Sequence, residues 1–228
     1  MVNIDTVYQR VLAIANKEQR GYITPQEFNL YANQAQMDIF EQYFYDLNQF
    51  MRLPGNDTEY SDMVNILEEK INIFETSTSP LVTNNSVDMS TISNFYRLGT
   101  VQLSGIEVEK VEHKDFKLMD RLPLAKPTTD RPVFYIKGNT MHIRPLGLQG
   151  NLVVHYVRRP LRAEWGYVVA NEKALYNAVR STDFQLHASE ETDLTIKILA
   201  LAGIMMDDQA LYQIASQEDI KNVQQEKQ

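Results

Sequence analysis

The chain has no cysteine, which narrows the chemistry that its 228 residues can support. Without thiols it can form no disulfide, no thiolate zinc site and no cysteine nucleophile. Long hydrophobic runs are missing too, because the longest fully apolar stretch, residues 198–206, is far shorter than the roughly 20 residues that cross a bilayer. The first residues carry neither the basic start nor the apolar stretch of a secretory signal. We therefore expect no membrane span and no export signal.

Sequence patterns of nucleotide-binding and hydrolytic sites do not occur either. The chain contains no G-x-S-x-G, no G-x-x-x-x-G-K-[ST] and no G-x-G-x-x-G. Its histidines show no metal-ligand spacing such as H-x₃-H; they are His113, His142, His155 and His187. Two of them, His142 and His155, fall in segments that we expect to be neighbouring strands, but no third ligand is near in sequence. These features favour a protein that is not an enzyme and has no cofactor and no metal.

Positive charge is in the minority, with 22 Lys and Arg against 30 Asp and Glu and a formal net charge of −8. A protein that grips a phosphate backbone over a broad surface needs a basic excess, so the balance argues against that class. An acidic wall past which nucleic acid slides is compatible with this charge, and so is ordinary solubility.

Apolar residues recur at spacings of three and four along the first third of the chain, as they do on one face of a helix. The pattern predicts helices over residues 3–18, 28–51 and 59–76, the second of which ends at Pro54-Gly55. Residues 76–93, by contrast, are mostly Ser, Thr and Asn and follow no period, which predicts an exposed, extended arm or long loop.

The clearest β pattern is VFYIKGNTMHIRP, residues 133–145. A two-residue Gly138-Asn139 loop would place Ile136 opposite Met141 and Phe134 opposite Ile143. Residues 151–160 alternate in the same way, so we expect a three-stranded antiparallel meander.

The C-terminal part of the chain indicates helices again. Residues 170–180 favour a short amphipathic helix, and Ser189 with the acidic residues after it indicates the start of a last helix. That helix is apolar nearly all round over residues 194–206, which implies burial inside the domain or between subunits.

The predicted fold class is α+β: mostly a helical bundle, with a small antiparallel β-sheet inserted before a long C-terminal helix. The expected organisation is an N-terminal helical hairpin or bundle over 1–78, an extended polar arm over 79–99, an antiparallel β region over 100–168, and C-terminal helices over 169–228 that complete the bundle and project a polar tail.

One stretch has the spacing of a calcium loop. In NKEQRGYITPQE, residues 16–27, Gly21 occupies the sixth place and Glu27 the twelfth. The fifth place, where an oxygen ligand should stand, holds Arg20, a cation with no acceptor. A tight turn between two helices accounts for the same residues, because Gly21 can end the first helix while Thr24 and Glu27 form a capping box for the second. An EF-hand-like calcium module is kept as an alternative.

Three stretches resemble virion proteins of tailed bacteriophages that lie near the portal. They are DRPVFYIKGNTMHIRP, NLVVHYVRRPLRAEWGY and STDFQLHASEETDLTIKILALAGI. The resemblance spans about residues 95–215 and implies a head-to-tail connector of the adaptor or tail-tubular class, which forms a ring, usually twelve-fold, beneath the portal. In that class a helical bundle builds the ring wall, the β portion faces the tail and the C-terminal helix grips the portal.

Carried onto this chain, the resemblance implies a virion protein at the head–tail interface that is made in the host cytoplasm. Its partners would be the portal protein, an adjacent tail or ring protein, further copies of the chain in a dodecamer, and double-stranded DNA in transit. The residues expected to dock on the portal are Leu211, Tyr212, Ile214 and Ile220. Packing between subunits is expected at Leu194, Ile198, Leu201 and Met205. Another minor capsid or tail structural protein would share these features.

Overall fold

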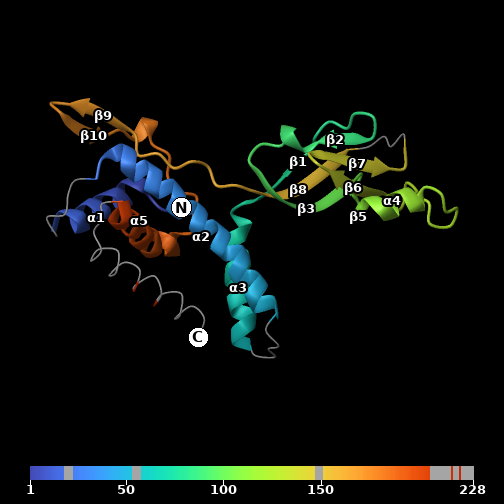
Figure 1. The fold of residues 1–228 in the computed structure, drawn as a ribbon, viewed down its shortest axis with the longest axis horizontal. Helices are drawn as coiled ribbons and strands as arrows, with labels where there is room; N and C mark the ends of the chain where they lie inside the picture. The colour runs from blue at the N-terminus through green and yellow to red at the C-terminus, as the bar shows by residue number, and fades with distance from the viewer. Residues whose placement is uncertain (18–22, 53–57, 147–150, 206–216, 218–220, 222–228) are drawn as a thin grey trace. The chain divides into compact units, whose positions relative to one another are not determined.

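The chain is an α+β protein that divides into two compact units (Figure 1). The computed structural model describes every residue except 18–22, 53–57, 147–150, 206–216, 218–220 and 222–228. Unit 1 consists of Met1–Ile73 and Pro160–Gln228, and unit 2 consists of Phe74–Arg159. Unit 2 is therefore an insertion in unit 1, and residues 160–168 of the expected β region belong to the helical unit.

Unit 1 is built from helices and one hairpin. In its described part the helices are α1 (Ile4–Lys17), α2 (Pro25–Arg52), α3 (Thr58–Asn72) and α5 (Glu191–Met205), and the hairpin strands are β9 (Tyr167–Ala170) and β10 (Lys173–Tyr176). Helix α5 packs against α1 and α2, and α2 also packs against α3. Fully buried residues of this core include Ile4, Phe28, Phe40, Phe184, Leu194 and Ile198. None of the described helices is long and apolar enough to cross a bilayer.

The capping box predicted at the start of α2 is confirmed. The Thr24 amide donates to Glu27 Oε2 over 2.9 Å, the Thr24 hydroxyl donates to the same oxygen over 2.7 Å, and the Glu27 amide donates back to Thr24 Oγ1 over 3.3 Å. Pro25 is the first helical residue, where its missing N–H costs nothing. The sequence therefore specifies this helix end through local contacts alone.

The start of α5 differs from the prediction. Its first residue is Glu191, and Glu190 belongs to the 3₁₀ turn Ala188–Glu190 that precedes it. The Glu190 carboxylate instead forms an ion pair with Lys70 Nζ at 2.6 Å, and only 6% and 15% of the two side chains are exposed. The Lys70 ammonium also lies 5.5 Å from the centre of the Tyr43 ring. This nearly buried pair ties α3 to the turn before α5.

The described part of unit 2 contains two four-stranded sheets. Their orders are β1-β8-β3-β4 and β2-β7-β6-β5. The strands are β1 (Glu75–Thr78), β2 (Ser86–Asp88), β3 (Phe95–Leu103), β4 (Ile106–Glu107), β5 (Glu109–Lys110), β6 (Val133–Lys137), β7 (Thr140–Arg144) and β8 (Leu152–Arg158). Buried side chains from both sheets form one cluster, which includes Val87, Val101, Phe134, Met141, Ile143, Leu152 and Val154. The two sheets therefore share one core.

The predicted hairpin is confirmed in its register. In β6 and β7, Ile136 pairs with Met141 and Phe134 with Ile143, and the turn glycine, Gly138, has a φ of 60°. The predicted meander is wrong, because β8 does not join this hairpin but lies between β1 and β3 in the other sheet. Alternation identified the strand, but it does not specify the strand's neighbours.

The polar arm predicted over residues 76–93 is also wrong. This stretch contributes β1 and β2, one to each sheet, and buries Val87, Met89 and Ile92 in the core of unit 2. Its polar residues make the turns: Asn84 and Asn85 have positive φ, and Asp88 caps a 3₁₀ turn by accepting from the Ser90 amide at 2.9 Å. A few apolar residues at the right places outweigh a polar composition.

One further segment differs from the sequence-based expectation. The segment 170–180, predicted as a helix, forms the second strand of the β9–β10 hairpin and a 3₁₀ turn, Ala178–Arg180. Asn171 and Glu172 both have positive φ, as a two-residue hairpin turn requires. The proline-rich connection after β5 contains the short helix α4 (His113–Met119), which packs on β6 through Phe116 and Tyr135, whose ring centres are 4.4 Å apart.

Candidate functional site

The segment that leads into the β9–β10 hairpin is held against α2 by side-chain amides. Asn29 accepts from the Trp165 amide (2.8 Å) and donates to the Trp165 carbonyl (3.3 Å). Asn33 does the same for Ala163, at 3.0 and 2.8 Å, and Gln36 donates to the Leu161 carbonyl at 2.8 Å. The amide side chains recur every three or four residues along α2, and they bond to every second residue of the extended segment 161–165. We call this set of contacts the amide ladder.

Trp165 anchors the end of the amide ladder in unit 1. Its side chain is 2% exposed, its Nε1–H donates to Asp5 Oδ1 at 2.9 Å, and its ring centre lies 4.2 Å from that of Tyr8. Tyr167 and Tyr176, which are paired at the base of the hairpin, lie within 6 Å of the same indole. The hairpin therefore starts from a fixed position.

Beyond that base the hairpin exposes apolar side chains. Val168, Val169 and Leu175 are 49%, 64% and 55% exposed. Neither β9 nor β10 pairs with any other described strand, so both outer edges of this two-stranded sheet are open. An isolated two-stranded hairpin gains little from its own contacts, and apolar open edges are typical of surfaces that bind a partner.

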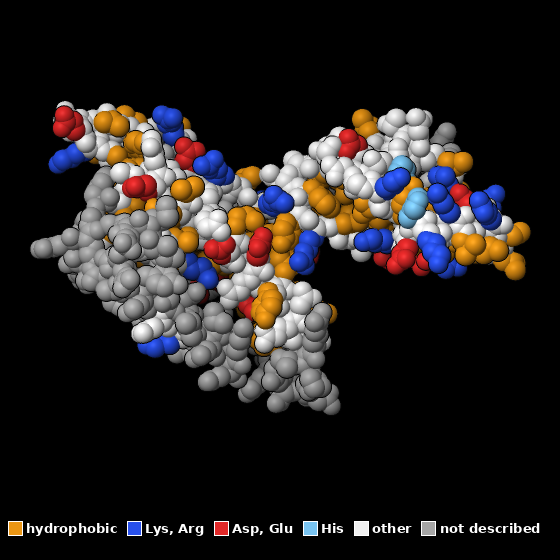
Figure 2. Space-filling model, in the orientation of Figure 1, with side chains coloured by type: hydrophobic (Ala, Val, Ile, Leu, Met, Phe, Trp, Pro, Cys, Tyr) orange, Lys and Arg blue, Asp and Glu red, His pale blue; other side chains and the backbone are white. Residues whose placement is uncertain are grey.

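A second exposed apolar surface lies on unit 2, on α4 and the loop after it. Figure 2 shows Lys and Arg side chains gathered there beside hydrophobic ones. The exposed leucines are Leu118, Leu122 and Leu124, and the exposed cations around them are Lys114, Lys117, Arg121 and Lys126. We call these seven residues the unit 2 tip.

An aromatic group fixes the unit 2 tip to the outer face of β6 and β7. The Tyr135 ring stacks on His142 with centres 4.8 Å apart, and His113 lies 4.7 Å away on α4. Arg144 lies over the Phe116 ring at 5.0 Å and forms an ion pair with Asp120 at 3.1 Å. Both ends of α4 are thus attached to the sheet.

Helix α2 presents a continuous exposed stripe, which we call the α2 face. Its residues recur at spacings of three and four, and they are Glu27, Leu30, Gln34, Asp38, Glu41 and Tyr45. Its charged members are all acidic, and none of these three carboxylates forms an ion pair with another described residue. Leu30 and Tyr45 are 60% and 65% exposed. The α2 face is therefore both acidic and partly apolar.

The two units differ in charge. Unit 2 has 11 Lys and Arg against 8 Asp and Glu, whereas unit 1 has 11 against 22. The chain's acidic excess thus resides entirely in unit 1.

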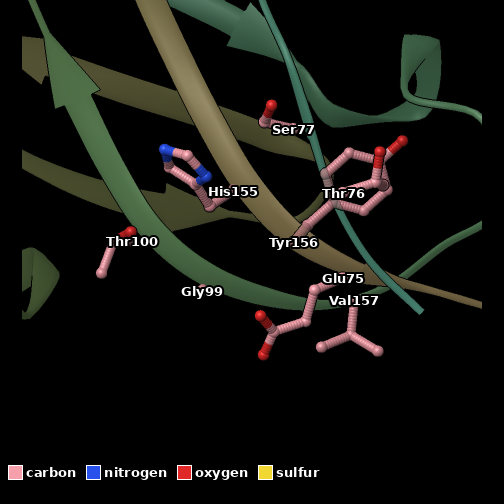
Figure 3. Close-up of a pocket in the computed structure, with 8 residues that line it drawn as sticks. All are labelled: Glu75, Thr76, Ser77, Gly99, Thr100, His155, Tyr156 and Val157. Atoms are coloured by element: carbon pink, nitrogen blue, oxygen red, sulfur yellow. The ribbon is translucent and has the colours of Figure 1, made fainter. Parts of the chain in front are cut away.

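A hollow of about 510 Å³ on the β1-β8-β3 sheet is lined by His155, Ser77 and Glu75, residue types that serve in hydrolytic catalysis. Figure 3 shows His155 between Thr100 and Ser77, and Glu75 lies on the same strand as Ser77. An activated nucleophile needs a hydrogen-bonded base, but no side-chain hydrogen bond links His155 to Ser77 or Glu75 among the described residues. The hollow coincides with a shift in the β3–β8 register between Leu98 and Val101. We assign it no reaction.

The structure separates residues that the sequence placed near each other. His142 lies on β7 and His155 on β8, in different sheets, so they are not neighbours as expected. Within the described residues, no group of three or more His, Asp or Glu side chains is placed to hold a metal ion. In the calcium-loop alternative, residues 18–22 lie outside the described residues, and Glu27 Oε2 is already bonded to Thr24.

The expected packing and docking residues lie at the C-terminal end. Leu194 and Ile198 are fully buried within their own unit, so in this structure they have no surface left for a second subunit. Leu201 is half-buried on α5, and Met205 is the last described residue of that helix. The portal-docking residues, Leu211, Tyr212, Ile214 and Ile220, lie outside the described part of the chain. Sequence reasoning missed the β9–β10 hairpin and the unit 2 tip. The sequence signal for the hairpin was apolar residues beside turn residues, and the signal for the tip was apolar residues beside charged ones.

Comparison with known proteins gave no family: no protein-family model matches the sequence. No curated protein matches it significantly either.

Proposed function

We propose that this chain is a structural virion protein of a tailed bacteriophage that forms a ring between portal and tail and lets DNA pass through its lumen. The observation that carries the proposal is the β9–β10 hairpin, an apolar element with two open edges that is fixed to unit 1 through Trp165. Such an element contributes little inside its own chain and is suited to assembly.

The charge distribution supports the same role. Unit 1 carries twice as many acidic as basic residues. A channel lined by acidic surface repels phosphates and releases no counterions on contact, so DNA can pass without adhering. The unit 2 tip, in contrast, offers cations and leucines for contact with protein.

Cryo-electron microscopy of virions tests the proposal directly. We expect density for the chain as a ring on the particle's central axis, between portal and tail. Density elsewhere in the capsid or tail would instead identify it as another minor structural protein, and absence from virions would reject both.

Complementation tests the hairpin. A chain with Val169→Lys and Leu175→Lys should keep its circular dichroism but fail to enter virions, because two charges replace the apolar surface. Leu81→Lys is the matched control, since Leu81 is 91% exposed and lies outside the hairpin. Equal incorporation of both variants would remove the hairpin from the proposal.

A further inference from the structure

We propose that copies of this chain associate head to tail, with the unit 2 tip of one copy docked along the α2 face of the next. The inference rests on the proposed function in that a ring needs a contact between copies. The two surfaces themselves are argued from the structure.

The unit 2 tip has cations without an acidic partner and exposed apolar area among the described residues of its own unit. Nearby cations are paired: Arg131 with Glu109 at 3.5 Å and Arg144 with Asp120 at 3.1 Å. Lys117 and Arg121, like the other two cations of the tip, pair with no described acid. Leu118, Leu122 and Leu124 lie among these cations and are about half to fully exposed. A partner for this surface must be acidic and must also offer apolar contact.

The α2 face meets both requirements. Its carboxylates have no cationic partner in the described chain, and Leu30 and Tyr45 stand about 22 Å apart along the helix axis. Among the described residues, the side chains of its acids form hydrogen bonds only with near neighbours in sequence: Glu27 with Thr24, just before the helix, and Asp38 with Gln34 at 2.8 Å. Leu118 and Leu124 are six residues apart and can be separated by at most about 22 Å, so the α2 face is long enough for all three leucines.

A second copy fits the tip better than nucleic acid does. A phosphate backbone would satisfy the four cations but would leave the three leucines against charged, hydrated groups. Stacking on bases requires exposed aromatic rings, and the tip itself contains none. Because the tip and the α2 face are different surfaces, each copy can dock on the next, and such heterologous contacts produce rings or open filaments.

Disulfide trapping tests the contact, since the natural chain has no cysteine. One chain carries Leu124→Cys in the tip, and a second, of different mass tag, carries Gln34→Cys in the α2 face. On mixing and mild oxidation we expect a covalent dimer of the two chains. The matched control replaces Leu124→Cys by Leu81→Cys, an exposed leucine of unit 2 outside the tip. A yield no higher than that of this control overturns the proposal.

Charge reversal tests complementarity. Lys117→Glu with Arg121→Glu in the tip chain should lower the trapping yield about tenfold, because several edge ion pairs become repulsions. Asp38→Lys with Glu41→Lys in the partner chain should restore it. About 1 M salt, where screening acts over roughly 3 Å, should reduce the unmodified pair's yield. A trapping yield that changes with neither charge reversal contradicts the proposal, provided circular dichroism shows that the variants fold.

Two outcomes distinguish the proposed interface from a contact within one chain and from the proposed function. If a chain carrying both cysteines closes on itself while singly substituted chains do not cross-link, the contact lies within one chain and the proposal is wrong. If virions show a ring of the chain but no trapping occurs, the proposed function stands and this interface does not. Trapping whose yield falls and recovers with the two charge reversals supports the interface whether or not the ring is found in virions.

Discussion

At the residue scale, the hydrogen bonds between Glu27 and Thr24 make the stability of the α2 start depend on pH. Hydrogen bonds from the Thr24 amide and then the Thr24 hydroxyl lower the pKa of Glu27 from its ordinary value of 4.5. A carboxylate whose folded pKa is depressed adds stability above the unfolded pKa, and this stability is lost as the pH falls through the folded pKa. Glu27→Gln should therefore destabilise unit 1 at pH 7 by about 0.5 kcal/mol, with the difference shrinking below about pH 4.

Urea unfolding followed by circular dichroism at pH 7 and at about pH 3 measures this difference. Glu41→Gln, on the same helix but without such hydrogen bonds to described residues, is the control and should cost less stability at pH 7. A constant gap between the natural chain and Glu27→Gln at both pH values would show that the carboxylate's charge plays no part.

Gly166 makes a steric requirement at the base of the hairpin. A Cβ at this position would lie 2.6 Å from both the carbonyl carbon and the oxygen of Arg180, which are backbone atoms and cannot turn away. We expect Gly166→Ala to lower the thermal stability of unit 1 by about 2 kcal/mol or more. In the control, Gly105→Ala, the added Cβ meets nothing within 4 Å, so the cost is about 1 kcal/mol from its φ of +84° and falls on unit 2.

At this scale, the sequence predicts a contact when the two residues that form it are close together in the chain. Thr24 and Glu27 are three residues apart, so their spacing already predicts the capping box. Gly166 shows no such signal, because the atoms that exclude a side chain belong to Arg180, whose position depends on the fold. Lys70 with Glu190 is a similar case, since the partners lie far apart in the sequence.

At the element scale, the amide ladder holds an extended segment on a helix. Ala163 is fully buried, and its N–H and C=O are both bonded to the Asn33 side chain. Asn33→Ala leaves both groups without these partners, so we expect unit 1 to lose about 2–4 kcal/mol. Hydrogen exchange should become faster at the amides of Ala163 and Trp165.

The matched control for the amide ladder is Asn48→Ala on the same helix. Asn48 is exposed, and among the described residues its side chain donates only to the Phe44 carbonyl, at 2.7 Å. Its loss should cost well under 1 kcal/mol and leave exchange at Ala163 unchanged. Similar losses for the two variants would mean that the amides of α2 do not position the hairpin.

Elements were predictable where turn chemistry and alternation agreed. The β6–β7 hairpin is the example, because Gly138-Asn139 fixes the loop and thereby the register. Residues 170–180 were not, because the turn Asn171-Glu172 lacks the glycine that marks most two-residue hairpin loops. Residues 76–93 were not either, since their short strands are stabilised by partners distant in sequence. For the same reason, the sequence does not predict the place of β8 in its sheet or the exposure of the hairpin at the candidate site.

At the scale of the whole molecule, the charge separation lies in the sequence but becomes visible only with the unit boundaries. The helical pattern predicted the bundle, and the change to a polar composition at residue 76 falls close to the boundary after Ile73, but no such change marks Pro160. The net charge of −8 averages an acidic unit 1 and a mildly basic unit 2. Surfaces for assembly can therefore be opposite in charge even though the chain as a whole is acidic.

The insertion of unit 2 predicts that each unit folds without the other. The two ends of unit 2 meet, because the Arg158 amide donates to the Phe74 carbonyl at 2.9 Å beside the β1–β8 pairing. A short Gly-Ser linker in place of residues 74–159 should thus close unit 1 without strain, and residues 74–159 alone retain their own buried core. Near pH 7 the isolated unit 2 should bind a cation exchanger and the closed unit 1 an anion exchanger, each with a cooperative thermal transition. Loss of that transition in either piece would mean that contacts with the other unit are needed for its fold.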